Sequence, residues 1–312
     1  MKYPESKTVL ILSTSTCNTE TVVGSWLGLG VGKTEIIYYD RIKVGPQDIE
    51  RIKPRMIIYI SALAPFNPTL DELRQMNELS PLIQILFDGG DPNWHPELLR
   101  WRDAFTLIVN IDGSPYWPSR DKDLTLLTPI DYRFYNNMPG ESDPQKDIHA
   151  GLAGAIGSGI RGYVMGYLHG RGLITHRCHS PTNSYKGYIG EAASYKEYAD
   201  FMRRCKIVVN HAMTANGSSH VKGRVLEAGW ASACLLENKN PITPLWFKPG
   251  VHYIEYSDAE HASQLIQQLK SEPERIDEMA RALHEEVVRN HSPRIFWGKV
   301  LDKVGWYPDG WK

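Results

Sequence analysis

The regular alternation of short apolar runs with amphipathic stretches in the first half of the chain is the feature that most constrains its fold. The apolar runs are rich in β-branched residues and have the length of strands, while the stretches between them have helical periodicity. The predicted strands are residues 8–13, 35–39, 55–61, 82–87 and 106–110, and the predicted helices are residues 20–27, 47–52, 69–79 and 96–104. Alternating strands and helices build a parallel sheet with helices on both faces, so the sequence predicts an α/β fold.

A second series of strands and helices follows a polar break at residues 136–144. The break contains Pro139, Gly140 and Pro144, which are typical of a connection between domains. After it, predicted strands at residues 173–176, 207–210, 233–236 and 252–255 alternate with predicted helices at residues 195–204, 223–231, 259–271 and 274–290. Because 312 residues suffice for two α/β domains, we expect one Rossmann-like domain over residues 1–140 and another over residues 141–290.

The composition indicates a protein without a strong electrostatic field of either sign. Its net charge of −1 gives no general attraction to nucleic acids or anionic lipids. The four cysteines are scattered, the start of the sequence lacks the pattern of a secretory signal, and no apolar run approaches the roughly 20 residues that span a bilayer. We therefore expect a cytoplasmic protein with reduced cysteines and no transmembrane segment.

The second half begins with a glycine-rich segment at residues 151–161, and its part at residues 154–161 is the first candidate ligand loop. In open parallel sheets, ligands bind at the carboxyl ends of strands. Gly157, Ser158 and Gly159 are small enough for backbone N–H groups to approach a diphosphate, and Arg161 could bind the same anion with two hydrogen bonds. The alternative interpretation is a tight turn followed by a surface arginine.

A polar loop at residues 210–220 leads into a helix that begins with basic residues. Lys222 and Arg224 at a helix N-terminus oppose the helix dipole, and a bound anion would remove that conflict. Glu227 follows about one and a half turns after Lys222 and could accept hydrogen bonds from a ribose. The candidate nucleotide-binding residues of this segment are Asn210, Ser218, Ser219, Lys222, Arg224 and Glu227. An exposed Lys and Arg with a locally paired Glu227 would fit the pattern equally well.

Three segments of the second half resemble a known family. They are residues 195–210 (YKEYADFMRRCKIVVN), 222–237 (KGRVLEAGWASACLLE) and 247–256 (FKPGVHYIEY). These segments resemble the C-terminal domain of group-1 glycosyltransferases of the GT-B fold, especially the branch that resembles the spore maturation protein B family. Residues 271–291 are similar to the final helices of that domain.

The resemblance implies a GT-B architecture, in which two Rossmann-like domains with parallel sheets face a central cleft. It implies that Glu227 holds the nucleotide ribose, that Arg161 and Lys222 neutralise the diphosphate leaving group, and that the helix and tail at residues 291–312 pack back toward the N-terminal domain. Related retaining families often have a second glutamate eight residues before the ribose-binding one, where this chain has Ser219. The stereochemistry of the transfer therefore stays open.

The first half would then bind the acceptor, and its candidate residues follow predicted strands. Asp88 could act as the general base on an acceptor hydroxyl, with Asp91 beside it, and Trp94 could stack on a sugar or a base. Asp91 fits equally well as the N-cap of a short helix. Ser13 and Thr14 could contact the acceptor, although capping of the first helix is the interpretation that we favour for them.

No pattern in the sequence predicts a structural metal. Asp121 and Asp123 have the Asp-x-Asp spacing of metal-dependent glycosyltransferases, but they precede a predicted strand, so we interpret them as solvated loop charges. His176, Cys178 and His179 lack a second pair of ligands.

We therefore expect a metal-independent glycosyltransferase that needs no cofactor and moves a sugar from a nucleotide-diphosphate sugar, with a UDP-sugar favoured, to an acceptor hydroxyl. The acceptor could be a glycan, a small molecule or a modified nucleic acid. Two alternatives are a sugar-nucleotide epimerase of the same architecture and a non-catalytic nucleotide-sugar-binding or scaffold protein.

Overall fold

The computed structural model describes residues 6–15, 17–61, 67–136, 144–154, 159–177, 194–213, 217–221 and 223–311. The chain forms two compact units, one of residues Met1–Pro129 with Pro293–Lys312 and one of residues Ile130–Ser292. Residues 130–136 count with the second unit because Tyr132 stacks on Trp230 at a ring-centroid distance of 5.4 Å, and Phe134 meets Tyr195 at 5.0 Å.

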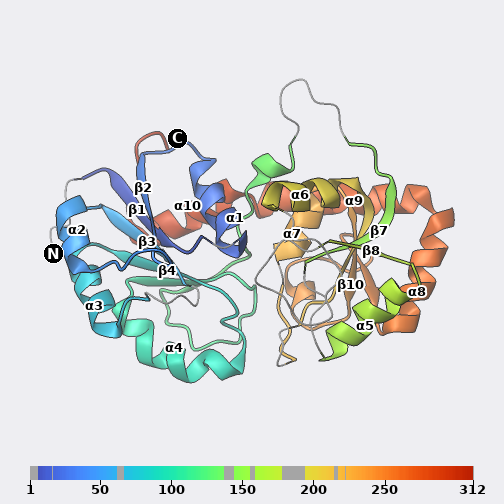
Figure 1. Cartoon of the computed structure of the whole chain (residues 1–312), viewed down its shortest axis with the longest axis horizontal. Helices are drawn as coiled ribbons and strands as arrows, with labels where there is room; N and C mark the ends of the chain where they lie inside the picture. Colours follow the sequence, from blue (N-terminus) through green and yellow to red (C-terminus); the bar gives the residue numbers. More distant parts are fainter. Residues whose placement is uncertain are drawn as a thin grey trace. The chain divides into compact units, whose positions relative to one another are not determined.

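The first unit contains a parallel sheet of six strands in the order β2-β1-β3-β4-β5-β6 (Figure 1). The strands are β1 (Thr8–Ser13), β2 (Lys33–Tyr38), β3 (Met56–Ile60), β4 (Leu82–Leu86), β5 (Leu107–Asn110) and β6 (Leu124–Thr125). The central strands are mostly apolar because both of their faces are buried. All five strands predicted for this half are present, with ends that differ by one or two residues.

Helices cover both faces of the first sheet. Val9 and Ile11 of β1 point into a core with α1 (Cys17–Leu27) and α10 (Pro293–Val304), while Leu10 and Leu12 point into a core with α2 (Pro46–Ile52), α3 (Leu70–Leu79) and α4 (His95–Trp101). Helix α10 joins this unit through Trp297, whose ring meets Trp26 edge-on at 5.1 Å and whose Nε1 donates to Ser25 Oγ at 3.0 Å. The last helix of the chain therefore completes the core of the first unit.

The second unit contains a parallel sheet of five strands in the order β11-β10-β9-β7-β8. The strands are β7 (Ile148–Ala153), β8 (Thr175–Arg177), β9 (Cys205–Asn210), β10 (Cys234–Asn238) and β11 (Ile254–Tyr256). Strand β7 was not among the predicted strands, and residues 151–153 of the glycine-rich segment belong to it. A Cβ on Gly151 would lie 2.4 Å from Cys205 Sγ and 2.9 Å from the Phe201 ring, so packing requires glycine there.

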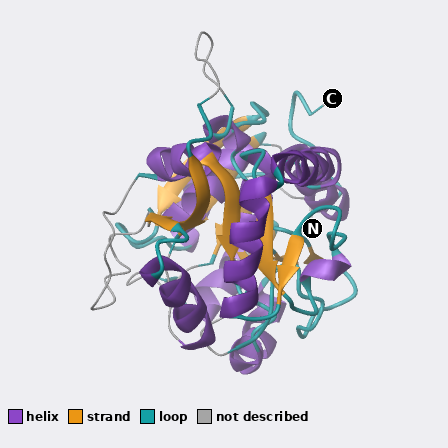
Figure 2. Ribbon diagram, turned by 90° about the vertical axis from the view of Figure 1, so that its right-hand side faces the viewer, coloured by secondary structure: helices purple, strands orange, loops and turns teal. Residues whose placement is uncertain are grey.

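Helices also cover both faces of the second sheet (Figure 2). On one face, α5 (Gly159–Gly170), α8 (Ala259–Gln268) and the first half of α9 (Pro273–Asn290) share a core with β7, β9 and β10. On the other face, α6 (Tyr195–Arg204) covers β7 at Gly151, and α7 (Gly223–Trp230) packs against α9. No helix among the described residues is long and apolar enough to cross a membrane.

Both sheets have the same order of strands relative to the chain. In each unit the first strand lies between the second and the third, as in the doubly wound order 2-1-3-4-5. The α/β fold with two Rossmann-like parallel sheets is thus confirmed. Ligands of such sheets bind at the carboxyl ends of the first and third strands, where the winding changes direction. In the second unit, this switch point lies between the ends of β7 and β9.

Candidate functional site

The switch point of the second sheet brings together residues from four elements. Gly154 follows β7, Asn210 ends β9, Arg161 lies in the first turns of α5, and Arg224 lies in the first turn of α7. Three of the predicted nucleotide-binding residues, Arg161, Asn210 and Arg224, are therefore neighbours at one edge of the sheet. Two arginines and the N-termini of two helices at one place favour an anionic ligand.

A chain of hydrogen bonds holds Arg224 at this edge. Arg224 Nη1 donates to Asn210 Oδ1 at 2.8 Å, and Asn210 Nδ2 donates to Glu237 Oε2 at 2.8 Å. Asn210 and Glu237 are fully buried. Within the described ranges, Arg224 Nε and Glu237 Oε1 have no hydrogen-bond partner. The Arg224 guanidinium group is thus fixed at Nη1 by Asn210, and its Nε–H can still donate to a ligand.

Gly154 makes room for the Arg224 guanidinium group. Its φ of +102° lies in a region that favours glycine, and a Cβ at this position would lie 2.9 Å from Arg224 Nη2 and 3.1 Å from Nε. The backbone of β7 and the arginine are therefore in direct contact. The glycine-rich sequence after the first strand serves this close approach.

Arg161 is buried, which contradicts its alternative interpretation as a surface residue. Its Nη1 donates to the backbone carbonyl oxygen of His211 at 3.2 Å. Tyr256 Oη donates to the Asn210 carbonyl oxygen at 2.8 Å and lies 2.9 Å from His211 Nδ1. Tyr256 has one hydroxyl proton, which it donates to Asn210. In a hydrogen bond between His211 and Tyr256, His211 Nδ1 is therefore the donor. Burial, with the charge of Arg161 acting in the same direction, lowers the pKa of His211 to about 4.

Glu237 is a buried acid that sequence reasoning did not identify as a site residue. Burial raises its pKa to about 8, against the opposing effects of the Asn210 hydrogen bond and of the charges of Arg224 and Arg161. The carboxyl group is therefore mostly neutral at pH 7. A signal was present in the sequence, since a glutamate inside an apolar strand is uncommon.

Glu227 lies one turn beyond Arg224 on α7 and is held by tyrosines. Its Oε1 accepts from Tyr195 Oη at 2.9 Å, and its Oε2 accepts from Tyr198 Oη at 2.8 Å. Burial raises the pKa of Glu227, partly offset by the hydrogen bonds from Tyr198, Tyr195 and Tyr135 and by the charge of Arg224. Each carboxylate oxygen can accept a second hydrogen bond. The predicted role of Glu227 in ribose binding stays a prediction.

The other predicted nucleotide-binding residues are placed only in part. Gly157, Ser158 and Lys222 lie outside the described residues. Gly159 is the first residue of α5. Ser219 forms an isolated antiparallel bridge with Met213, and Ser218 and Ser219 are both partly buried. Ser218 and Ser219 belong to the segment that follows β9.

The acceptor-side residues lie at the carboxyl edge of the first sheet. Asp88 follows β4 with a φ of +54°, a left-handed conformation that is uncommon for a residue other than glycine. Asp91 caps the 3-10 helix Pro92–Trp94 by accepting from Asn93 N at 3.1 Å, and the Trp94 side chain is partly exposed. Ser13 and Thr14 are buried, and Thr14 Oγ1 lies 3.3 Å from Thr19 Oγ1.

Asp112 anchors the loop that carries Asp88, and sequence reasoning missed it. Its Oδ2 accepts from Gly90 N at 2.8 Å, and its Oδ1 accepts from Ser114 N at 2.8 Å and from Asn110 Nδ2 at 2.7 Å. Burial raises the pKa of Asp112, with the Gly90 and Ser114 hydrogen bonds opposing it. The loops after β4 and β5 therefore form one hydrogen-bonded surface.

The interpretation of Asp123 as a solvated loop charge was wrong. Its side chain is fully buried and accepts from Arg120 Nη2 at 2.8 Å and from the backbone N–H of Ile108 at 3.0 Å. Asp123 thus fixes the start of β5. His176 is also buried, with Nε2 2.8 Å from the Gly154 carbonyl oxygen, while Cys178 and His179 lie outside the described residues. Across the described ranges, no group of three or more His, Cys, Asp or Glu residues could hold a metal.

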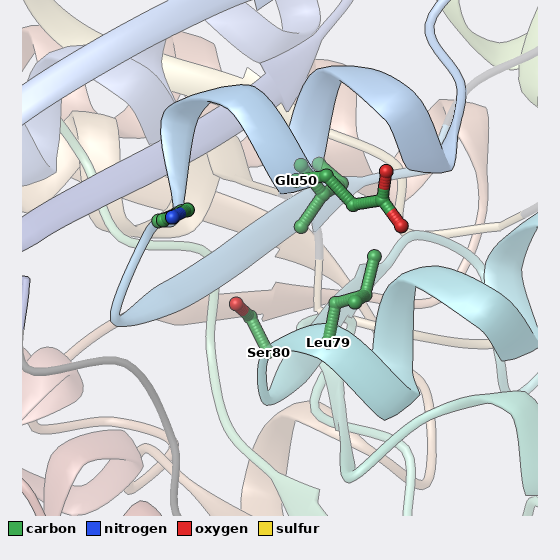
Figure 3. Close-up of a pocket in the computed structure, with 5 residues that line it drawn as sticks. Glu50, Leu79 and Ser80 are labelled. Atoms are coloured by element: carbon green, nitrogen blue, oxygen red, sulfur yellow. The ribbon is translucent and has the colours of Figure 1, made fainter.

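Two shallow hollows lie away from these carboxyl edges. One of about 240 Å³ lies between α2 and the end of α3, where Glu50 faces Leu79 and Ser80 (Figure 3). The other, of about 200 Å³, includes Lys146 and Lys206 at the starts of β7 and β9. Both lie toward the amino ends of strands, so neither coincides with the predicted ligand sites.

Comparisons with known proteins agree with this geometry. Residues 155–302 match the model of a family described as glycosyl transferase-like. HepE of Anabaena, solved with UDP-glucose, superposes with a TM-score of 0.65 at 11% identity over 96% of this chain and 100% of that chain. A glycosyltransferase from Rickettsia africae gives 0.64 at 10% over 96% and 98%. A putative UDP-N-acetylglucosamine 2-epimerase from Listeria monocytogenes gives 0.57 at 10% over 97% and 98%. Comparison with curated proteins gives no match.

The fold is therefore that of GT-B proteins, as predicted, and the family match lies on the unit that carries the two arginines. The chain thus has the GT-B fold, and its residues 155–302 are similar to a glycosyl transferase-like family. At about 10% identity the likeness to the solved structures concerns the fold alone. The narrower resemblance to the spore maturation protein B branch stays a prediction.

Proposed function

We propose that the protein transfers a sugar from a nucleotide-diphosphate sugar to an acceptor hydroxyl without a metal ion, and that the donor is a UDP-sugar. The observation that carries this proposal is the placement of Arg161 and Arg224 at the switch point between β7 and β9. Departure of a nucleoside diphosphate develops negative charge on its terminal phosphate, and fixed positive groups at that point lower the barrier. HepE, which shares the fold, is solved with UDP-glucose.

Each residue has a role in this proposal. Arg161, Arg224 and Lys222, with the N–H groups at the start of α5, bind the diphosphate and supply the positive charge that a metal ion supplies in other transferases. Glu227 binds the ribose while it retains its tyrosine partners. Asp88 accepts the proton of the acceptor hydroxyl. A glycan, a small molecule or a modified nucleic acid would satisfy the chemistry of the acceptor.

Calorimetric titration with UDP, GDP, ADP, CDP and dTDP tests the donor site. We expect one nucleotide to bind with a dissociation constant in the micromolar range, roughly 8 kcal/mol of binding free energy. Arg224→Gln should weaken that binding at least about tenfold, because a charge-assisted hydrogen bond is lost. Arg281→Gln removes the same charge from an exposed position on α9 and is the matched control. If none of the five nucleotides binds the wild-type protein, the proposal is wrong.

An epimerase is the second candidate, because the Listeria protein of that description shares the fold. Incubation with UDP-glucose and UDP-N-acetylglucosamine in the absence of any acceptor separates the two activities. A new epimer of the sugar nucleotide would favour the epimerase, and release of UDP only when an acceptor is added would favour the transferase. Nucleotide binding with neither reaction would favour a non-catalytic role.

A further inference from the structure

Glu237 has no role in the function proposed above, but two hydrogen bonds through Asn210 connect it to Arg224. The two side chains come from β10 and α7, and the Asn210 side chain at the end of β9 lies between them. Asn210 presents its oxygen to Arg224 and its nitrogen to Glu237, with both contacts at 2.8 Å. An amide can be fixed in this orientation only if an acceptor faces its nitrogen.

Glu237 Oε2 accepts a hydrogen bond from Asn210 Nδ2. Within the described part of the chain, Glu237 Oε1 has no partner. A buried carboxyl group with an unpaired oxygen is costly, so its presence in an apolar strand requires an explanation. Packing alone would be served by an apolar residue at this position.

We propose that Glu237 is a positioning residue, which holds the Asn210 amide so that Asn210 orients the Arg224 guanidinium group toward the donor diphosphate. This inference rests on the proposed function for the identity of the ligand. Gly154 limits the guanidinium group on the opposite side, since a Cβ there would lie 2.9 Å from Arg224 Nη2. Arg224 is thus held between a fixed amide and the backbone of β7.

The arrangement makes diphosphate binding depend on pH. The ionisable groups that face Glu237 are Arg224 of α7, Arg161 of α5, and Tyr253, Glu255 and Tyr256 at β11, with His211 bonded to Tyr256. Burial raises the pKa of both tyrosines and lowers that of His211 to about 4, so these groups do not titrate between pH 7 and 9. The negative charge of a bound diphosphate disfavours the ionised form of Glu237. The affinity of the protein for the diphosphate should therefore fall as the pH rises from 7 to 9.

Titration with UDP tests the proposal on three variants. Glu237→Gln keeps an acceptor for Asn210 but cannot ionise, Glu237→Ala removes the acceptor, and Glu278→Gln changes an exposed glutamate of α9 as the control. We expect Glu237→Ala to bind UDP about tenfold more weakly at pH 7 and Glu237→Gln to bind it as the wild type does. Between pH 7 and 9, the UDP affinity of the wild type and of Glu278→Gln should fall about tenfold relative to that of Glu237→Gln. Ionisation of the ligand is the same for every variant, so it cancels in this comparison.

A second measurement without nucleotide separates failure of this proposal from failure of the proposed function. The ¹⁵N resonances of the Arg224 guanidinium group, assigned with Arg224→Lys, should show slow side-chain rotation in the wild type and in Glu237→Gln, and fast rotation in Glu237→Ala. Unchanged rotation in Glu237→Ala, or a pH dependence of UDP affinity that persists in Glu237→Gln, would overturn the positioning role. If the wild type binds no nucleotide, the proposed function fails, and the rotation of Arg224 still decides whether Glu237 positions it.

Discussion

Replacing Glu237 by glutamine should change how the stability of the protein depends on pH. The carboxyl group is fully buried, and burial raises its pKa from the 4.5 of an exposed glutamate to about 8 in the folded protein. Between these values the folded protein retains a proton that the unfolded chain loses, so the free energy of unfolding falls as the pH rises. The separation is about 3.5 pH units, and at about 1.4 kcal/mol per unit the loss amounts to about 5 kcal/mol.

Urea unfolding followed by circular dichroism at pH 5, 6, 7 and 8 measures this effect. Other ionisable groups also contribute to the wild-type curve, but they are common to both proteins. The difference between Glu237→Gln and wild type should therefore grow by about 4 kcal/mol in favour of the variant between pH 5 and 8. Glu278→Gln on the surface of α9 should give a curve parallel to that of the wild type. Parallel curves for Glu237→Gln would show that Glu237 is ionised throughout, and the description of it as a neutral buried acid would be refuted.

Three further predictions concern glycines and Glu227. Gly154→Ala should lower the free energy of unfolding by about 1–3 kcal/mol and weaken UDP binding, because its Cβ meets Arg224 and its φ is +102°; wild-type UDP affinity in this variant would contradict the contact. Gly151→Ala should lower the free energy of unfolding by about 1–3 kcal/mol, because its Cβ would clash with Cys205 Sγ. Gly166→Ala, on the open side of α5, should raise the free energy of unfolding by about 0.5–1 kcal/mol in the same urea assay. Equal effects of the two substitutions would rule out packing as the cause. Glu227→Ala should lower the free energy of unfolding by about 1–3 kcal/mol for each tyrosine hydroxyl that it leaves without an acceptor, and Glu227→Gln should lower it less. Calorimetric unfolding measures both losses. Equal losses in the two variants would contradict the tyrosine contacts.

The elements that the sequence predicted well are those with local signals. Helix α6 was predicted with its observed bounds because Ser194 and Glu197 form a capping box, in which Ser194 Oγ accepts from Glu197 N at 3.3 Å and Glu197 accepts from Ser194 N at 2.8 Å. Thr69 and Glu72 form the same arrangement at the start of α3. Such contacts lie within one helical turn, so a single sequence contains them completely.

Strand β7 was missed because its signal is not local. Glycine in a strand is unfavourable by propensity, and only the long-range contact with Cys205 and Phe201 explains Gly151. The same holds for Asp123, whose partner Arg120 is near in sequence but whose burial depends on the backbone of β5. Local patterns cannot show which charges a sheet will cover.

The candidate site shows why the residues that contact a ligand are easier to predict than those that hold them. Arg161 and Arg224 are basic residues beside glycines at helix starts, and this pattern made an anion site one of the two interpretations of each segment. Glu237 directly follows the apolar run of residues 233–236, and its relation to Arg224 depends on two hydrogen bonds through Asn210 of a third element, β9. An arginine that must meet a diphosphate in one orientation needs such support, because its long side chain otherwise samples many rotamers. A glutamate in an apolar strand marks Glu237 as unusual, but its positioning role follows only from the demand for a fixed guanidinium group.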